Sequence, residues 1–226
     1  MSKTRHIAEN FKVGALLTLV GGYLDTYTYI SRGGVFANAQ TGNIVLMGLK
    51  LKGGEFAEAV HYFIPILSFV AGVLLVELVK SRFNDDPKVH WHQLTLALEM
   101  LIVVVVAFIP ESHNNIANVL VSLTCAMQVE GFRRLNGNAY ATTMCTGNLR
   151  SGSESLFAYL KTKDITQRQK ALQYYGIILI FIAGAVIGAV LTGLIGIKAV
   201  LFCLAGQAGA LLVLRTYKTP DDKAAE

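Results

Sequence analysis

Long stretches without a charged side chain are the feature that most restricts how this chain can fold. A helix needs about 20 mainly apolar residues to cross a bilayer core of about 30 Å. Charged residues make up only 15% of the chain, against about a quarter in soluble proteins. Uncharged stretches cover residues 13–24, 63–76, 100–109 and 177–197. The sequence therefore predicts an all-α, polytopic membrane protein whose first partner is the lipid bilayer.

Composition and motifs argue against several other classes of protein. The net charge of +5 comes from basic residues at the ends of apolar segments, as membrane topology requires, so no nucleic-acid partner is expected. The cysteines lie in apolar stretches without metal-ligand spacing, which argues against a zinc site or a disulfide framework. Because there is no HExxH or GxSxG motif, we expect neither an enzyme nor a cofactor.

Internal similarity divides the chain into two related halves. The tripeptide Thr-Gly-Asn at 41–43 recurs at 146–148, and the same shift of 105 carries Asp25 onto Glu130. Such collinear self-similarity indicates a duplication within one membrane domain of residues 1–226. Repeat one is expected at about 12–109 and repeat two at about 115–215. Two further matches relate 62–72 to 174–184 and 96–99 to 204–207.

We expect six apolar spans, with one polar segment inside each half. The polar segments, at about 33–51 and 136–160, contain the two Thr-Gly-Asn motifs. Unpaired polar groups that face hydrocarbon cost several kcal/mol each. Each segment is therefore either a full span that faces the protein interior or a re-entrant, broken element. The six spans are expected at about 12–30, 57–80, 91–109, 115–133, 170–193 and 198–215.

The distribution of basic residues favours the re-entrant arrangement. With six spans and both termini in the cytoplasm, 16 of the 20 Lys and Arg residues lie inside, whereas eight full spans would place 13 inside. The positive-inside rule therefore predicts six spans. Three spans per half is an odd number, so the second half enters the membrane inverted, a plan common in secondary transporters. The basic residues left outside are Arg32, Lys50, Lys52 and Lys198.

Three short segments of the first half give the chain a resemblance to a known family. They are Gly-Tyr-Leu-Asp at 22–25, Gly-Val-Phe-Ala-Asn at 34–38 and Thr-Gly-Asn at 41–43. On these residues the chain resembles the YoaK-like family of bacterial inner-membrane proteins, which are grouped under a domain of unknown function. The second half departs from the family's usual Gln-Asn-Ala, with Gln-Val-Glu at 128–130. The resemblance implies a six-span protein of the bacterial inner membrane and no established substrate.

Three acidic residues are candidates for coupling transport to a proton or a cation. Asp25 lies late in the first span, either as a functional carboxylate at membrane depth or within an aromatic belt at the outer interface. Glu130 stands near Arg133, so a structural ion pair at the inner surface is the alternative to a site role. Glu99 lies near the centre of its span and must face the protein interior. There it either binds a cation or proton, or hydrogen-bonds across packed helices.

The two Thr-Gly-Asn segments are the candidate solute-binding elements. Threonine can cap a helix, glycine permits a break, and asparagine supplies both a donor and an acceptor. Two helix N-termini brought together by inverted symmetry can hold an anion or a polar neutral solute. Close helix packing is the structural alternative. The candidate residues are Asn38, Gln40, Thr41, Gly42, Asn43, Gln128, Thr146, Gly147 and Asn148.

Together these features predict a secondary transporter of a small polar solute that rocks between its inverted halves. A passive channel with paired half-helices is the first alternative, and a non-transporting membrane scaffold or sensor is the second. Carboxylates within the membrane favour the transporter, because a channel needs no titrating group. Small residues at Gly184-Ala185 and Gly188-Ala189 predict close helix packing and also allow a homodimer.

Overall fold

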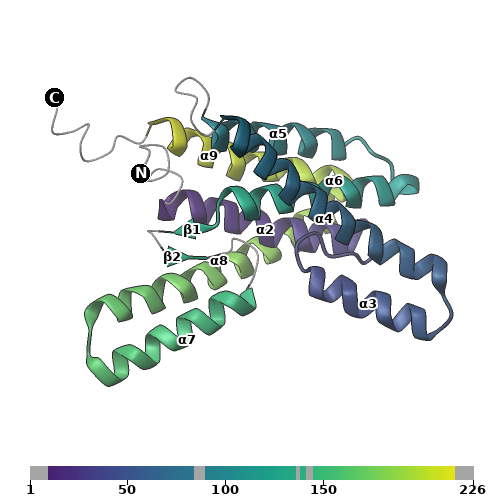
Figure 1. Ribbon diagram of the computed structural model, residues 1–226. Coiled ribbons are helices and arrows are strands. Elements are labelled where there is room, and N and C mark those ends of the chain that lie inside the picture. Colours follow the sequence, from purple (N-terminus) through teal and green to yellow (C-terminus); the bar gives the residue numbers. More distant parts are fainter. Residues whose placement is uncertain (1–9, 84–89, 136–137, 141–144, 217–226) are drawn as a thin grey trace.

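The fold is helical throughout the described residues, apart from one pair of two-residue strands (Figure 1). The computed structural model describes residues 10–83, 90–135, 138–140 and 145–216. Its short elements are the 3-10 helices η1 (Glu111–His113) and η2 (Gly196–Phe202) and the antiparallel strands β1 (Arg134–Leu135) and β2 (Asn138–Ala139). The α-helices are α2 (Phe11–Ser31), α3 (Gln40–Lys52), α4 (Phe56–Phe83), α5 (Trp91–Val106), α6 (Asn114–Gly131), α7 (Cys145–Thr162), α8 (Ile165–Ile195) and α9 (Cys203–Thr216).

These helices follow the expected spans closely, with two departures in the second half. The span expected from 198 becomes α-helical only at Cys203, because Gly196 ends α8 with a φ of 63° and η2 follows. A positive φ of this kind is unfavourable for any residue with a Cβ. The polar segment expected at 136–160 is not one element, since α7 begins only at Cys145, after the strand pair. The expected helical membrane class is confirmed.

Apolar side chains on two long helices face outward, where lipid can solvate them. α4 and the continuous helical region Ile165–Thr216 are long and apolar enough to cross a membrane, and only 22% of the most apolar window of each is buried. Monomeric soluble proteins rarely expose continuous apolar surface of this kind. The stripe on α4 consists of Leu67, Leu74 and Leu78, and the stripe on α8 consists of Leu179, Val186 and Val190. Each residue of the α4 stripe lies 112 positions before a residue of the α8 stripe, which is the same shift that relates segments 62–72 and 174–184.

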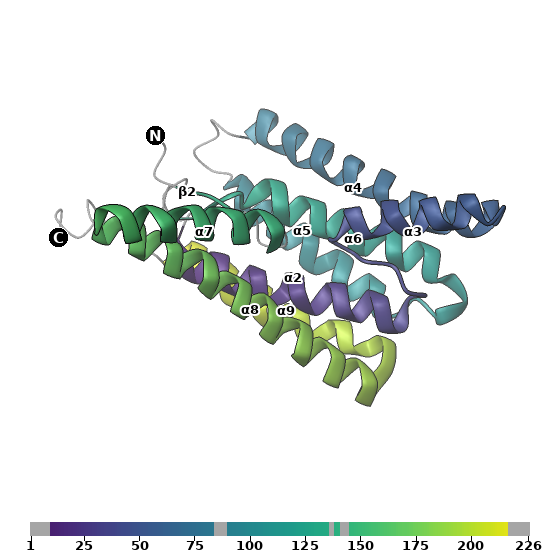
Figure 2. The same ribbon diagram turned by 90° about the horizontal axis from the view of Figure 1, so that it is seen from below.

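The helices form two bundles, and each bundle combines helices from both halves of the sequence. In the first bundle, α2 packs along α8 and α9, and α7 packs on α8. In the second bundle, α6 packs along α4 and α5, and α3 packs on α4. Exchanging α2–α5 with α6–α9 therefore converts one set of contacts into the other. Equivalent helices also run in opposite directions, as α2 and α6 do in both views (Figure 1 and Figure 2).

Close contacts between helix backbones hold each bundle together. A Cβ added to Gly184 of α8 would lie 2.1 Å from the carbonyl oxygen of Leu19 on α2. Gly72 of α4, which matches Gly184 in the sequence, would place a Cβ 2.7 Å from the carbonyl oxygen of Leu123 on α6. Real Cβ atoms essentially never approach within 3.0 Å, so these two contacts need glycine. Because α2 covers Gly184, that residue no longer supports a homodimer.

Replacing Gly184 with alanine should push α2 and α8 apart. Overpacking of this kind costs about 1–3 kcal/mol, so the detergent-purified variant should unfold at a lower temperature than the wild-type protein. Gly193→Ala is the matched control, because a Cβ at Gly193 on the same helix meets no atom within 4 Å. Equal unfolding temperatures for the two variants would mean that the contact with Leu19 does not hold the bundle.

Two of the helices, α3 and α7, begin in the middle of the molecule and run to opposite ends (Figure 1 and Figure 2). α3 has 13 residues. At a rise of 1.5 Å per residue it is about 20 Å long, too short to cross a bilayer core. α7 has 18 residues, among them the charged Arg150, Glu154 and Lys161. We call α3 and α7 the half-helices.

Asp164 fixes the turn that joins α7 to α8. Its carboxylate accepts hydrogen bonds from the backbone N–H of Thr166 at 2.8 Å and from the Thr166 hydroxyl at 2.7 Å. These bonds favour the ionised form and lower the pKa of Asp164. A lowered pKa adds stability above the unfolded-state value of about 3.9 and loses it as the pH falls through the folded-state value.

The first turn of α8 should therefore fray when the pH is lowered below about 4. Hydrogen exchange of residues 165–168, corrected for the intrinsic effect of pH on exchange, measures this fraying. Asp164→Asn can still cap the helix but cannot ionise, so its protection should not change with pH. A pH dependence that persists in Asp164→Asn would assign the effect to another group.

Candidate functional site

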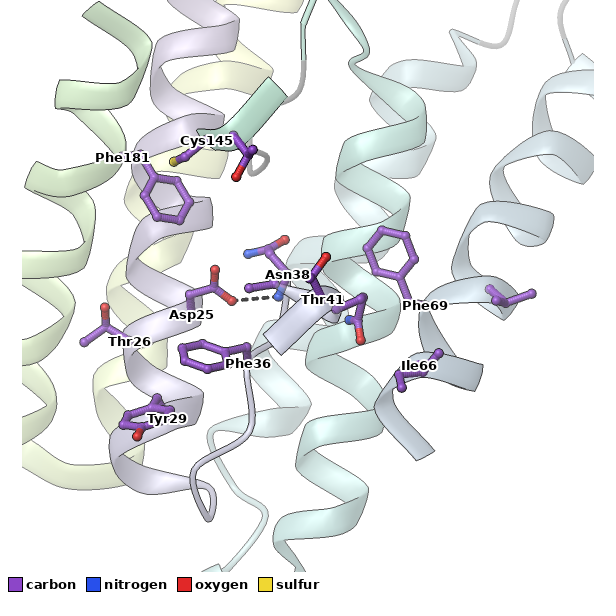
Figure 3. Close-up of a pocket in the computed structure, with 14 residues that line it drawn as sticks. Asp25, Thr26, Tyr29, Phe36, Asn38, Thr41, Ile66, Phe69, Cys145 and Phe181 are labelled. Atoms are coloured by element: carbon purple, nitrogen blue, oxygen red, sulfur yellow. Dashed lines mark hydrogen bonds between the residues drawn. The ribbon is translucent and has the colours of Figure 1, made fainter. Parts of the chain in front are cut away.

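A cavity of about 610 Å³ lies between the two bundles, and both half-helices begin at its wall (Figure 3). The first bundle contributes residues of α2, α7 and α8, and the second contributes residues of α3 and α4. Most of the lining is apolar. Asp25 is the acidic group among the described lining residues, which include no Lys or Arg. Within the described residues, no three His, Cys, Asp or Glu side chains are grouped to hold a metal ion.

Asp25 lies in the cavity wall at the start of the half-helix α3, and not in an aromatic belt at the outer interface. The side chain is 7% exposed, and its Oδ1 accepts a hydrogen bond of 2.7 Å from the backbone N–H of Asn38 (Figure 3). The backbone groups of Ala37 and Ala39 also lie close enough to interact with the carboxylate. Asp25 thus occupies the position at the helix N-terminus where an anionic ligand would otherwise bind.

Two electrostatic energies decide whether the cavity favours an anion or a cation: attraction to the helix N-termini and repulsion from Asp25. Attraction of an anion to a partly buried helix N-terminus is worth up to about 2 kcal/mol, and only the end of α7 is left for a second anion because Asp25 already faces the end of α3. Repulsion between an ionised Asp25 and a second negative charge about 4 Å away is about 4 kcal/mol at an effective dielectric constant of 20. The carboxylate therefore outweighs the helix ends, and the cavity favours a cation when Asp25 is ionised.

Asn38 places an unpaired acceptor beside Asp25. Its Nδ2 donates a hydrogen bond of 3.0 Å to the carbonyl oxygen of Gly21 on α2. Its Oδ1 is buried without a hydrogen-bond partner among the described residues, and Asn38, only 5% exposed, lines the cavity. A buried acceptor without a donor costs about 1–3 kcal/mol. This oxygen is buried from the cavity as well as from water, so a ligand would reach it only after the Asn38 side chain turned.

In the first Thr-Gly-Asn motif, the threonine lines the cavity, whereas the glycine and the asparagine pack against the preceding linker. Thr41 lines the cavity together with its neighbour Gln40. Asn43 is fully buried; its Oδ1 accepts from the backbone N–H of Phe36 at 3.1 Å, and its Nδ2 donates to the Phe36 carbonyl at 2.8 Å. Gly42 packs against the ring of the same Phe36. Asn43 and Gly42 therefore fasten the linker to α3 and lie outside the cavity lining, so we assign them positioning roles instead of solute binding.

The second half-helix reaches the cavity with its first two residues. Cys145 and Thr146 line it. Gly147 and Asn148, which were also predicted to bind solute, are not among the lining residues. Asn148 is buried and takes part in interactions within the protein. Residues 141–144, which precede α7, lie outside the described residues.

Residues that match between the two halves of the sequence meet at the cavity. Thr41 and Thr146, at a shift of 105, form one such pair. Phe69 of α4 and Phe181 of α8 form another, at a shift of 112, and Figure 3 shows them on opposite sides. The two phenylalanines were not predicted as site residues. Their equivalent places in the matched segments 62–72 and 174–184 were the signal that could have identified them.

Gln128 and Glu130 lie away from the cavity lining, although both were predicted site residues. The Nε2 of the buried Gln128 donates a hydrogen bond of 2.9 Å to the carbonyl oxygen of Leu17, which ties α6 to α2. Glu130 forms an ion pair of 2.8 Å with Arg133. It also interacts with Glu77 of α4. A structural ion pair therefore describes Glu130 better than a coupling role.

The packing also changes which residue corresponds to Asp25. Gly184 faces Leu19 on α2, and its match Gly72 faces Leu123 on α6. These two contacts therefore align α2 with α6 at a shift of 104, whereas the Thr-Gly-Asn motifs are 105 positions apart. At this smaller shift Asp25 corresponds to Val129, so the carboxylate in the cavity has no acidic counterpart.

Glu99 lies at the boundary between the two bundles, outside the cavity lining. It is fully buried on α5 and interacts with Gln207 of α9, its match in the duplication. Neither oxygen of Glu99 makes a hydrogen bond of normal geometry with a described residue, and neither does the Gln207 amide. An ionised, unpaired carboxylate in such a place would cost several kcal/mol. Burial without a well-formed hydrogen bond to a described residue therefore favours the uncharged form of Glu99.

Arg32, counted from the sequence as an external charge, is fully buried. Its Nε donates to the Tyr27 hydroxyl at 2.9 Å, and its two terminal nitrogens donate to the carbonyl oxygens of Ile109 at 2.9 Å and Val106 at 3.0 Å. The guanidinium thus lies at the C-terminal end of α5, where the helix dipole is negative. The Asn118 amide in turn donates to the Arg32 carbonyl. Arg32 therefore joins α2 of the first bundle to α5 and α6 of the second.

The part of the chain that matches known proteins contains both half-helices and the residues that line the cavity. The model of the family described as "Protein of unknown function (DUF1275)" matches residues 13–214. The chain is 29% identical over 185 residues to the UPF0700 transmembrane protein YoaK of Bacillus subtilis (strain 168), which covers 77% of this chain and 80% of that protein. No solved structure matches. The resemblance to the YoaK-like family is thereby confirmed, and the chain is a membrane protein that belongs to the DUF1275 family.

Proposed function

We propose that the protein is a secondary transporter of a small solute, built from two inverted repeats of three spans and one half-helix each. The opposite directions of equivalent helices support this architecture (Figure 1). The exchange of contacts between the two bundles supports it as well. So do the lipid-facing stripes on α4 and α8, which correspond at the same shift of 112 as the packing residues Gly72 and Gly184.

The observation that carries the proposal is one cavity that both half-helices share. Thr41 and Thr146 mark the two helix N-termini in its wall, and Asp25 supplies a charge. Transporters with inverted repeats bind their solutes at such interrupted helices, near the middle of the bilayer. The support for this function comes from the site, because the family brings no substrate with it.

The two bundles are the bodies that would move against each other. Rocking was expected between the halves of the sequence, but each half contributes its first helix to the bundle of the other. The cavity and the Glu99–Gln207 contact both lie between the bundles. A rocking motion would therefore open the cavity and expose Glu99 together, which would couple solute access to a proton.

The orientation is proposed from the charges at the helix ends. The start of α2, the α7–α8 turn and the ends of α4, α6 and α9 lie at one end of the molecule (Figure 1 and Figure 2). We assign this end to the cytoplasm of a bacterium, with both termini there. The residues Lys3, Arg5, Lys88, Lys218 and Lys223, which enter the charge count, lie outside the described residues. Basic residues in the last turns at this end are Lys80, Arg82, Lys161 and Arg215.

Cys145 offers a direct test of alternating access, because it lines the cavity while Cys125 and Cys203 are fully buried. A membrane-impermeant maleimide should label Cys145 in right-side-out vesicles and, in a separate experiment, in inside-out vesicles. Cys145→Ser is the control for labelling elsewhere. Labelling from one face only would contradict alternating access.

A passive channel is the second candidate, and the paired half-helices at one cavity favour it. A channel would also admit the maleimide from both faces, so leakage must be measured in parallel. Proteoliposomes are tested for passive flux of K⁺, urea and glycerol by light scattering. A transporter should leave these fluxes at the level of protein-free liposomes, whereas a continuous leak would support the channel. Labelling from neither face, without flux, would favour the scaffold or sensor.

A further inference from the structure

The cavity carries one negative charge, on Asp25, which has acceptor positions to spare. Asp25 accepts donors from the backbone at the start of α3, but a carboxylate offers about four acceptor positions. The Oδ1 of Asn38 lies behind the same wall, buried from the cavity, and has no donor among the described residues. A charged acceptor with open positions fits a cationic group that carries N–H donors.

Aromatic rings make up much of the remaining wall. Tyr29 of α2 and Phe36 of the linker are stacked, with ring centroids 4.8 Å apart, and both line the cavity. Phe69 and Phe181 approach from the two bundles (Figure 3). Aromatic faces attract cations through the quadrupole of the ring and also bury apolar surface. At about 610 Å³, the cavity has the size of pockets that hold small organic molecules and is far larger than an inorganic cation needs.

We propose that the cavity binds a protonated organic amine with an apolar body, whose ammonium group is held by the carboxylate of Asp25. The apolar body would lie between the rings of Phe69 and Phe181. This inference deepens the proposed function, on which it rests for its biological meaning, because it names the class of solute. It replaces the expectation from the sequence that the helix N-termini hold an anion or a neutral solute.

A proton competes with the amine for Asp25, since a protonated carboxyl group has no charge to offer. Other titratable side chains near Asp25 are Tyr29 on α2 itself, Cys145 on α7 and Cys125 on α6. The residues that α4 and α8 present to the cavity are not titratable. Binding should therefore weaken when the solution is acidified from mildly alkaline pH, and each bound amine should displace part of a proton. An alkylamine itself stays protonated throughout, because its pKa resembles that of lysine, about 10.4.

The test uses 4-phenylbutylamine and 4-phenylbutyrate, which share an apolar body and differ in the sign of their charge. Isothermal titration calorimetry on the detergent-purified full chain should show the amine binding at least about tenfold more tightly than the acid. Asp25→Asn keeps an acceptor for the backbone of α3 but loses the charge, and should weaken amine binding about 10- to 100-fold. Glu154→Gln makes the same chemical change at an exposed position on α7 and should bind like the wild-type protein.

Three results would overturn the proposal: equal or tighter binding of the acid, unchanged amine binding in Asp25→Asn, or no binding of either probe. If Asp25→Asn fails to fold, the charge selectivity of the wild-type protein and its response to acid decide the question. If the amine binds but Cys145 is not labelled from both faces, the amine site stands and the transporter proposal fails. If Cys145 is labelled from both faces but the amine does not bind, the transporter proposal stands and the proposed class of solute is wrong.

Discussion

Replacing Glu99 with glutamine is expected to reduce transport driven by a pH gradient to background while the protein stays folded. Glutamine has nearly the same shape and carries no ionisable group, so the fully buried site should lose less than about 1.5 kcal/mol. A residue that only filled space between α5 and α9 would tolerate this change. A residue that must gain and lose a proton in each cycle would not.

Infrared difference spectroscopy can test the protonation of Glu99 without any knowledge of the solute. In an Asp25→Asn background, which removes the other carboxyl group that can take up a proton at this boundary, the protein should show the carbonyl stretch of a protonated carboxylic acid, and Glu99→Gln should remove it. Uptake of radiolabelled amino acids, polyols, nucleobases and organic amines into proteoliposomes, with and without a pH gradient, measures the functional loss. Uptake that is the same in Glu99→Gln and in the wild-type protein would remove the coupling role and favour a passive channel.

The contact with Gln207 permits a sharper version of the experiment. Glu99 and Gln207 interact across the boundary between the bundles, and they hold matching places in the segments 96–99 and 204–207. Exchanging them in the double variant Glu99→Gln/Gln207→Glu moves the acid to the other bundle but leaves it at the same boundary. We expect the exchange to restore the infrared band and part of the gradient-driven uptake. Restoration of the band without uptake would show that the acid must belong to α5.

Much of the fold could be predicted because the bilayer restricts what an uncharged stretch can do. The apolar runs predicted α2, α4, α5, α6 and α8 to within a few residues at most ends. The Thr-Gly-Asn motifs predicted where helices begin, and both α3 and α7 start within one residue of their threonine. These features depend on local sequence and on the solvent, both of which can be judged along the chain.

What could not be predicted depends on contacts between distant segments. Phe69 and Phe181 belong to apolar runs in which lipid-facing and cavity-facing residues look alike. The exchange of first helices between the bundles leaves no trace in the order of the elements. The contacts of Asn43 could not be predicted, because its donor and acceptor bond to Phe36, only seven residues away. An amide is as suited to holding backbone as to holding a solute.

Arg32→Ala is expected to lower the free energy of unfolding by about 3–5 kcal/mol, because it leaves several buried acceptors without donors. The guanidinium now bonds to the Tyr27 hydroxyl and to the carbonyl oxygens of Val106 and Ile109. Thermal unfolding of the purified variants measures the loss. Lys198→Ala removes an exposed cation, also counted as external, and should change stability by no more than about 0.5 kcal/mol.

Arg32→Lys separates the charge of this residue from its geometry. An ammonium keeps the charge but cannot reach three acceptors held by a planar, forked group, so lysine should rescue little of the loss. If Arg32→Lys were as stable as the wild-type protein, charge alone would explain the burial, and the guanidinium would not be needed to join the bundles. The expected failure of lysine would instead show that the guanidinium of Arg32 is needed to join α2 to the ends of α5 and α6. A count of charges along the sequence cannot distinguish such a joint from a cation that lies in water.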